Sequence, residues 1–305
     1  MSFFITLSAV ATMLLYAIPA YALCKSKVIK AEHIPVLASI LIYLCTPAII
    51  IDSFQKLTFS KEIVLDLAIY LILSFLIQLV MMGGVWLIVR KSRNRHSRIA
   101  AIAAALGNCG FLGLPLIKAL LPANPEAVIY SAIFSIGMNT IALTFGSLII
   151  SGDKKYIKVK KIFLNPAMIG TYAGVALFIF GIKLPNILGN ALGAVVALST
   201  PVCMFVLGMR LSTVQFYRIF TNFSVYLAVF AKQIVMPLIA LAITLMLPLD
   251  PIMETAFIII SSCPVAAVVL NLSELLGDGQ KYAADCVLLG TLLSILTIPA
   301  ISLLI

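Results

Sequence analysis

The chain has 305 residues, of which 63% are hydrophobic and only 10% are charged, and its mean hydropathy is +1.17. These values exclude a soluble globular protein and indicate a polytopic protein embedded in a lipid bilayer. The formal net charge of +10 does not indicate a nucleic-acid partner, because the basic residues lie in short polar stretches between apolar runs, as membrane topology requires.

Charged residues divide the chain into ten apolar spans, each close to the length that a bilayer requires. They cover residues 3–23, 35–54, 67–89, 99–121, 127–150, 163–182, 187–209, 220–247, 252–276 and 283–305. The first span is predicted to be a retained helix. No Lys or Arg precedes it, and Lys25, Lys27 and Lys30 follow it, which is the reverse of a secretory signal.

The fourth span is not an ordinary transmembrane helix. Gly107, Gly110, Gly113 and Pro115 weaken its hydrogen-bond ladder within about two turns, and Asn108 adds a carboxamide. Unpaired polar groups cannot face lipid, so this pattern predicts a broken helix that lines a substrate site. The alternative is that the glycines only allow two helices to pack closely.

Polar or helix-breaking residues also lie inside other spans: Thr46-Pro47, Asn139, Thr200-Pro201, Lys232 and Ser262-Cys263-Pro264. Pro47 and Pro201 are expected to break or kink their helices. Lys232 is the only basic residue in the middle of a span, and a charge at that depth is expensive enough to suggest a function. The alternatives are that Lys232 snorkels to the interface or pairs with carbonyls of a broken helix.

The two halves of the chain repeat. An offset of 154 residues carries Thr46-Pro47 onto Thr200-Pro201 and Cys109 onto Cys263, and it places Asn108 on Ser262. At an offset of 155, the sequence from Gln78 to Met81 resembles that from Gln233 to Met236. Three matches in register indicate duplication. Residues 1–152 and 153–305 each hold five spans, an odd number, so the halves must have opposite orientations. The broken fourth span then has a partner that Pro264 breaks at the matching depth, and such pairs indicate a transport site.

Basic residues cluster after the first, third, fifth and seventh spans, which places these loops in the cytoplasm. Both termini are therefore expected outside a plasma (inner) membrane. The six cysteines form no Cys-x-x-Cys or Cys/His cluster, and the two histidines lie in basic loops. We therefore expect no metal, no cofactor and no enzyme activity.

The segment from Gly107 to Leu116 resembles the fourth-helix motif of the auxin efflux carrier family, which includes the plant PIN carriers and bacterial permeases. Pro264-Val265-Ala266-Ala267 resembles its ninth-helix motif, and Gly290 to Ser294 with Pro299 its tenth helix. The resemblance covers essentially the whole chain. It departs at two points. Plant carriers have Pro where Gly107 stands, and many bacterial members have Asn at the position of Val268, whereas the nearest Asn here is Asn271.

The resemblance implies ten helices in two inverted five-helix repeats, with helices 4 and 9 broken and crossing. It implies a scaffold of helices 1, 2, 6 and 7, a transport domain of helices 3–5 and 8–10 that moves as an elevator, and a homodimer through the scaffold. Plant members carry an indole carboxylate, and bacterial relatives are associated with malate or malonate.

From these patterns we expect substrate contact from one set of residues: Asn108, Cys109, Gly110, Ser262, Cys263, Pro264, Asn139, Lys232, Thr46 and Thr200. The expected helix breakers are Gly107, Gly113, Pro115, Pro47 and Pro201. The alternatives are that Asn108 only caps its helix, and that Ser262 and Cys263 only pack.

The leading hypothesis is a secondary carrier of a small organic anion, a mono- or dicarboxylate such as malate or malonate or an auxin-like carboxylate. No Asp or Glu lies in the middle of a span, which favours uniport. A sodium- or proton-coupled symporter is the alternative. A sensor without flux, or an intramembrane enzyme, is disfavoured by the short loops and by the absence of catalytic groups at membrane depth.

Overall fold

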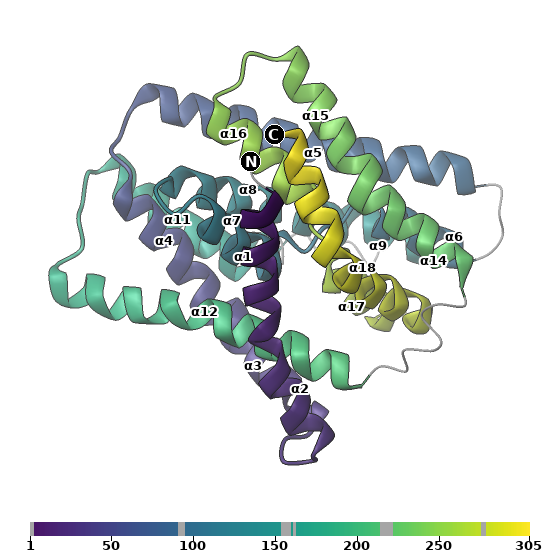
Figure 1. Ribbon diagram of the computed structural model, residues 1–305. Helices are drawn as coiled ribbons and strands as arrows, with labels where there is room; N and C mark the ends of the chain where they lie inside the picture. The colour runs from purple at the N-terminus through teal and green to yellow at the C-terminus, as the bar shows by residue number, and fades with distance from the viewer. Residues whose placement is uncertain (1–2, 91–94, 154–159, 161–162, 214–221, 276–278) are drawn as a thin grey trace.

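The computed structural model describes residues 3–90, 95–153, 160, 163–213, 222–275 and 279–305 (Figure 1). Its helices are α1 (Phe3–Leu15), α2 (Ala17–Lys25), α3 (Ile34–Ile40), α4 (Thr46–Lys56), α5 (Lys61–Val89), α6 (Arg95–Ala103), α7 (Leu114–Leu120), α8 (Pro125–Ile141), α9 (Ser147–Ser151), α11 (Pro166–Ile179), α12 (Asn186–Ser212), α14 (Phe223–Phe230), α15 (Met236–Met246), α16 (Pro251–Ser261), α17 (Ala267–Leu275) and α18 (Gln280–Ile301). No strand occurs within the described ranges, so the predicted all-α class is confirmed.

Seven helical stretches of the described chain are long and apolar enough to cross a bilayer: Phe3–Lys25, Ala31–Lys56, Lys61–Val89, Pro125–Ser151, Asn186–Ser212, Phe223–Met246 and Gln280–Leu304. Three shorter apolar helices, Cys109–Leu120, Pro166–Ile179 and Pro251–Ser261, lie where the fourth, sixth and ninth spans were expected. The protein is therefore a multi-pass membrane protein.

Three prolines follow π-helical turns. The turns Leu41–Cys45, Cys109–Gly113 and Ala231–Val235 each lead into a helix that has a proline as its second residue. Those prolines are Pro47, Pro115 and Pro237. A proline lacks an N–H group and its ring clashes with the carbonyl one turn earlier, so a locally widened turn accommodates it. Pro201 does not break its helix, because it lies inside α12, which continues to Ser212; the kink expected there stays a prediction. A helix buried in lipid tolerates the loss of one hydrogen bond.

Two interrupted helices cross by pairing their backbones. The chain leaves helical geometry after α6 and resumes it at the π-helical turn that begins at Cys109; likewise it leaves α16 and re-enters α17. Between them, Gly107 and Val265 form an antiparallel bridge. The N–H of Asn108 donates to the Pro264 carbonyl at 2.7 Å, and the N–H of Ala266 donates to the Leu106 carbonyl at 2.8 Å. These bonds satisfy backbone groups that no helix could pair.

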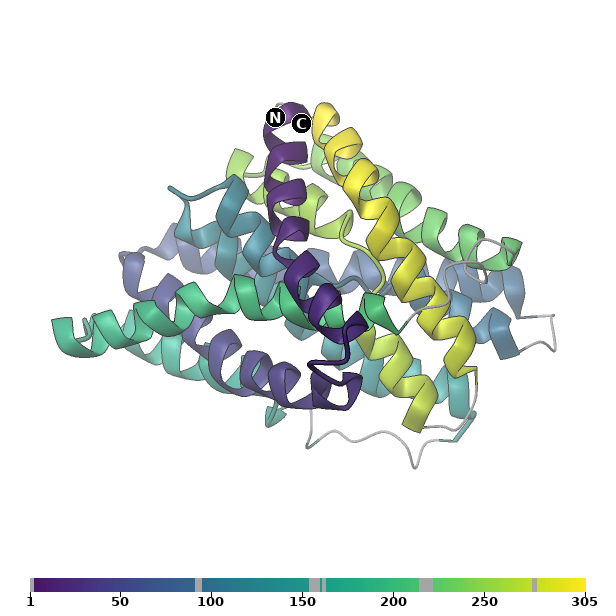
Figure 2. The same ribbon diagram turned by 60° about the horizontal axis from the view of Figure 1, so that its bottom comes forward.

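Small residues bring α11 against α4. A Cβ atom at Gly170 would lie 2.7 Å from Pro47 Cα, and one at Gly174 would overlap the Phe54 ring. The Gly-x-x-x-Gly spacing places both glycines on one face of α11, which is the usual way for membrane helices to approach closely. α4 also contacts α12, α12 contacts α2, and α5 packs on α8. α1 and α18 lie side by side, with the N and C ends close together in both views (Figures 1 and 2).

Candidate functional site

A cavity of 510 Å³ opens beside the crossing of the two interrupted helices. It lies among the crossing segments, the turn before α4, the middle of α8, and the beginnings of α11 and α17. Its polar lining consists of Tyr43, Thr46, Asn108, Ser135, Asn139, Lys160, Asn165 and Asn271. The rest is apolar, as ligand pockets usually are. Among the described residues, the lining includes one basic side chain, Lys160, and no acidic one.

The beginnings of two half-helices face this cavity. Gly110 and Phe111 lie in the first turn after Asn108, and Ala267 and Val268 are the first residues of α17; all four line the cavity. The first N–H groups of a helix have no acceptor in a preceding turn of that helix. N–H groups at a helix start carry partial positive charge. The two ends together therefore favour an anion in the cavity.

Asn108 stands at the junction of the crossing and the cavity. Its backbone is fixed, because its N–H donates to Pro264 and its carbonyl accepts from the N–H groups of Leu112 at 3.1 Å and Gly113 at 2.9 Å. The carboxamide does not cap the following helix and makes no hydrogen bond to any described residue. The alternative that Asn108 only caps its helix therefore does not fit the structure. The Asn108 backbone is fixed by hydrogen bonds and its side-chain amide has no partner among the described residues, so the amide is available to bind a substrate.

Other polar groups of the cavity are already oriented by local hydrogen bonds. The Asn139 amide donates to the Ser135 carbonyl at 2.8 Å, which leaves its own carbonyl oxygen as a further acceptor. The Thr46 hydroxyl donates to the Leu41 carbonyl at 2.8 Å. Asn271, on α17, is exposed to the cavity and lies three residues after Val268. Val268 stands where many bacterial members have Asn, so the sequence did not assure a side-chain amide from this helix. Asn271 lies about one helical turn further on and supplies an amide to the same cavity.

Four of the predicted site residues lie behind the crossing. Cys109, Ser262, Cys263 and Pro264 are buried and do not line the cavity. In the antiparallel bridge between Gly107 and Val265, the two matching hydrogen bonds are donated by the N–H groups of Asn108 and Ala266, which lie 158 residues apart. On that register the counterpart of Asn108 is Ala266. Residues 266–268, which were not among the predicted substrate contacts, line the cavity where Ser262 and Cys263 were expected.

Thr200 also lies elsewhere. It lines a separate cavity of 720 Å³ among α1, α7 and α12, together with Pro115 and Lys118. Thr46 lines the 510 Å³ cavity. The two threonines that match by sequence thus face different spaces.

Lys232 is fully buried within the crossing and does not line the cavity. It lies on the π-helical turn between α14 and α15, and its ammonium donates to the Ser261 carbonyl at 2.6 Å. A Cβ atom at Gly107 would lie 2.8 Å from Lys232 Cε and 2.9 Å from Nζ. No carboxylate in the described part of the chain forms an ion pair with Lys232. The pairing with a carbonyl of a broken helix, which the sequence left as an alternative, is the arrangement present.

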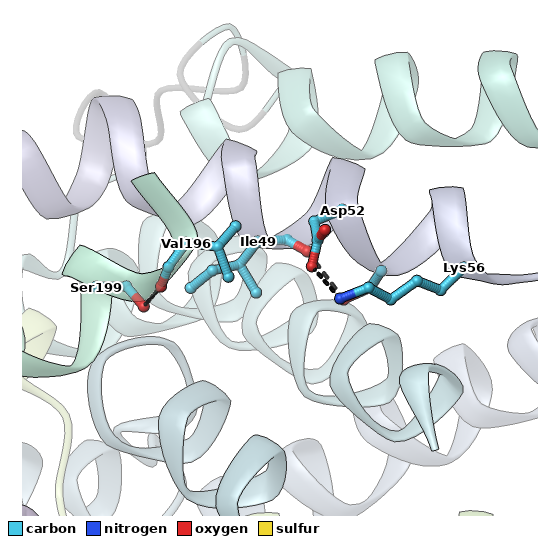
Figure 3. Close-up of polar contacts among 6 residues, drawn as sticks. Ile49, Asp52, Lys56, Val196 and Ser199 are labelled. Atoms are coloured by element: carbon cyan, nitrogen blue, oxygen red, sulfur yellow. Dashed lines mark hydrogen bonds and ion pairs between the residues drawn. The ribbon is translucent and has the colours of Figure 1, made fainter. Parts of the chain in front are cut away.

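A third cavity, of 350 Å³, lies between α4, α12 and the segment before α8. Asp52 and Lys56, one turn apart on α4, form an ion pair at 2.7 Å that borders it (Figure 3). Val196 of α12 faces Ile49 of α4 in the same view. The described lining of this cavity contains the acidic Asp52 as well as the basic Lys56 and Lys118, and in this it differs from the cavity at the crossing.

Comparison with known proteins identifies related sequences. A family model described as "Membrane transport protein" matches residues 5–302, which is nearly the whole chain. A protein of Rhizobium meliloti named "Putative malonate transporter" is 23% identical over 273 residues, covering 87% of this chain and 85% of that protein. An uncharacterized transporter of Methanocaldococcus jannaschii is 25% identical over 286 residues, covering 89% of each chain.

Proposed function

Because the chain belongs to this family of membrane transport proteins, of the auxin efflux carrier type, we propose that it is a secondary carrier that moves a small organic anion across the membrane. The observation that carries this proposal is the 510 Å³ cavity, which two half-helix starts and Lys160 face and whose lining, in the part of the chain that the structure describes, contains no acidic side chain. Such a site attracts an anion without a metal or a catalytic group.

The substrate class is a mono- or dicarboxylate of the size of malonate or malate. Each carboxylate group needs several donors, and the cavity offers the Asn108 amide, backbone N–H groups at the two half-helix starts and the Lys160 ammonium. The name of the Rhizobium meliloti relative supports malonate. The apolar part of the lining would also accept an indole carboxylate, so an auxin-like substrate belongs in the test.

Transport proceeds by alternating access of an elevator type. The chain forms two inverted five-helix repeats, residues 1–152 and 153–305, in a plasma (inner) membrane with both termini outside. The packing of α4 on α11 and α12, and of α12 on α2, supports a scaffold built from the first, second, sixth and seventh spans. The crossing would travel with the remaining helices and carry the bound anion past that scaffold.

Flux is uniport. Proton-coupled carriers usually place a carboxyl group at membrane depth, and neither the span interiors nor the cavity lining offers one. The anion then moves down its own electrochemical gradient. Coupling to sodium or protons is the competing mechanism, and the same assay separates the two.

The test is uptake into proteoliposomes of labelled malonate, malate and an indole carboxylate, with and without a sodium or proton gradient. We expect saturable uptake of one carboxylate that needs no gradient. Loss of an amide that binds a charged group costs about 1.5–3 kcal/mol, so Asn108→Ala should weaken apparent affinity roughly 10- to 100-fold. Asn190→Ala, on the exposed surface of α12, is the matched control. Normal uptake by Asn108→Ala would move the site elsewhere, and no uptake of any carboxylate would refute the substrate class.

A further inference from the structure

The carbonyl that binds the Lys232 ammonium lies at the end of α16, where the N–H groups that follow the helix donate to other carbonyls. The N–H groups after α16 donate to the carbonyls of Ile258, Ile259 and Ile260. The Ser261 carbonyl, at the negative end of that half-helix, instead accepts from the Lys232 ammonium at 2.6 Å. The Ser261 hydroxyl oxygen is also buried and has no hydrogen-bond partner in the described part of the chain. The ammonium therefore binds a backbone carbonyl at the end of a broken helix.

Gly107, in the other segment of the crossing, leaves room for this ammonium. A side chain at position 107 would meet the end of Lys232, because even a Cβ atom would lie 2.8 Å from Cε. Gly107 is also the residue that pairs with Val265. Gly107 thus pairs with the other segment of the crossing and, because it has no side chain, leaves space for the Lys232 ammonium.

In the part of the chain that the structure describes, no carboxylate forms an ion pair with the Lys232 ammonium. The Lys232 side chain is also completely buried. An unpaired charge at such depth is costly and is retained for a reason. Half-helix C-terminal ends and unwound carbonyls are the groups with which transporters coordinate coupling cations. The Lys232 ammonium occupies a position of that kind.

We propose that Lys232 supplies a resident cation at the crossing, in the place where a coupled carrier would bind sodium, and thereby makes transport independent of sodium. This inference rests on the proposed carrier function. The ammonium positions the two crossing segments, and so the half-helix starts on the far side that face the anion. It does not touch the substrate, because it does not line the cavity.

The test removes the ammonium and returns it as a small molecule. Lys232→Ala removes the side chain from Cγ to Nζ and so leaves room for a methylammonium ion, whereas Lys232→Met fills most of that space without a charge. We expect both variants to lose at least tenfold in malonate uptake. Added methylammonium should restore uptake by Lys232→Ala at least threefold, and should not restore Lys232→Met, in which the space is filled. Wild-type uptake should not depend on sodium.

A second measurement separates this inference from the proposed function. Methylammonium should raise the unfolding temperature of purified Lys232→Ala, whether or not malonate is the substrate. It should not raise that of Gln233→Ala, in which the neighbouring buried side chain, bonded to the Gly290 carbonyl, is removed without loss of charge. Wild-type uptake that requires sodium, full activity of Lys232→Met, or no effect of methylammonium on the stability of Lys232→Ala would each overturn the inference. Absence of malonate uptake by the wild type, with the stability effect present, would refute only the substrate.

Discussion

Gly107→Ala should destabilise the protein through one identified contact, the end of the Lys232 side chain. The new Cβ would lie 2.8 Å from Lys232 Cε and 2.9 Å from Nζ, whereas ordinary contacts begin at 3.4 Å. The ammonium must therefore retreat by roughly 0.6 Å, which strains its 2.6 Å hydrogen bond to the Ser261 carbonyl. Overpacking and a weakened charged hydrogen bond each cost about 1–3 kcal/mol, so we expect a loss of that size.

The assay is equilibrium unfolding in mixed micelles, run as a double-mutant cycle with Lys232→Ala. Removing the Lys232 side chain also removes the clash, so Gly107→Ala should cost little in that background, and the interaction energy should be about 1–2 kcal/mol. Gly84→Ala in α5, where an added Cβ meets nothing within 4 Å, is the matched control. An equal cost of Gly107→Ala in both backgrounds would show that position 107 is constrained by its backbone alone, and would refute the steric argument.

Three further predictions concern packing, binding and charge. Gly208→Ala should cost about 1–3 kcal/mol, because the added Cβ would overlap the Ala17 carbonyl where α12 packs on α2; thermal unfolding measures this, and unchanged stability would contradict it. Asn271→Ala should raise the KM for malonate roughly 10-fold with little change in maximal rate, since it removes one amide of the cavity; an unchanged KM would exclude this residue from the site. Lys56→Ala should change the free energy of unfolding by no more than about 0.5 kcal/mol, because 56% of the Lys56 side chain is exposed in its ion pair with Asp52. A larger loss in the same unfolding assay would contradict the reasoning that this ion pair is screened by solvent.

The broken fourth and ninth segments could be predicted from the sequence, because glycine, proline and asparagine interrupt apolar runs that otherwise continue as helices. Asn108 could be singled out for the same reason, and it does line the cavity. The all-helical, multi-pass class followed from hydropathy alone.

The register of the crossing could not be predicted in this way. Matching Cys109 with Cys263 placed Ser262 and Cys263 at the cavity, but the two matching hydrogen bonds of the crossing relate Asn108 to Ala266, four residues beyond Ser262. That register depends on which carbonyls and N–H groups of two unwound segments meet, and this is a property of tertiary packing. The same limit applies to Lys232: a central charge marked it as unusual, but only the packed structure shows that its partner is the Ser261 carbonyl.

The closeness of the two chain ends bears on how the protein is made. α1 lies along α18, so the first and last helices meet although they are synthesised at opposite ends of translation (Figure 2). A short linker across these ends, with new ends opened between α9 and α11, would give a circular permutant in which the second half is translated first. In the inverted repeat that we propose, such a chain would insert its leading helix in the opposite direction to the native order. Its folding would show that each half carries its own topogenic signals, independent of which half the ribosome delivers first.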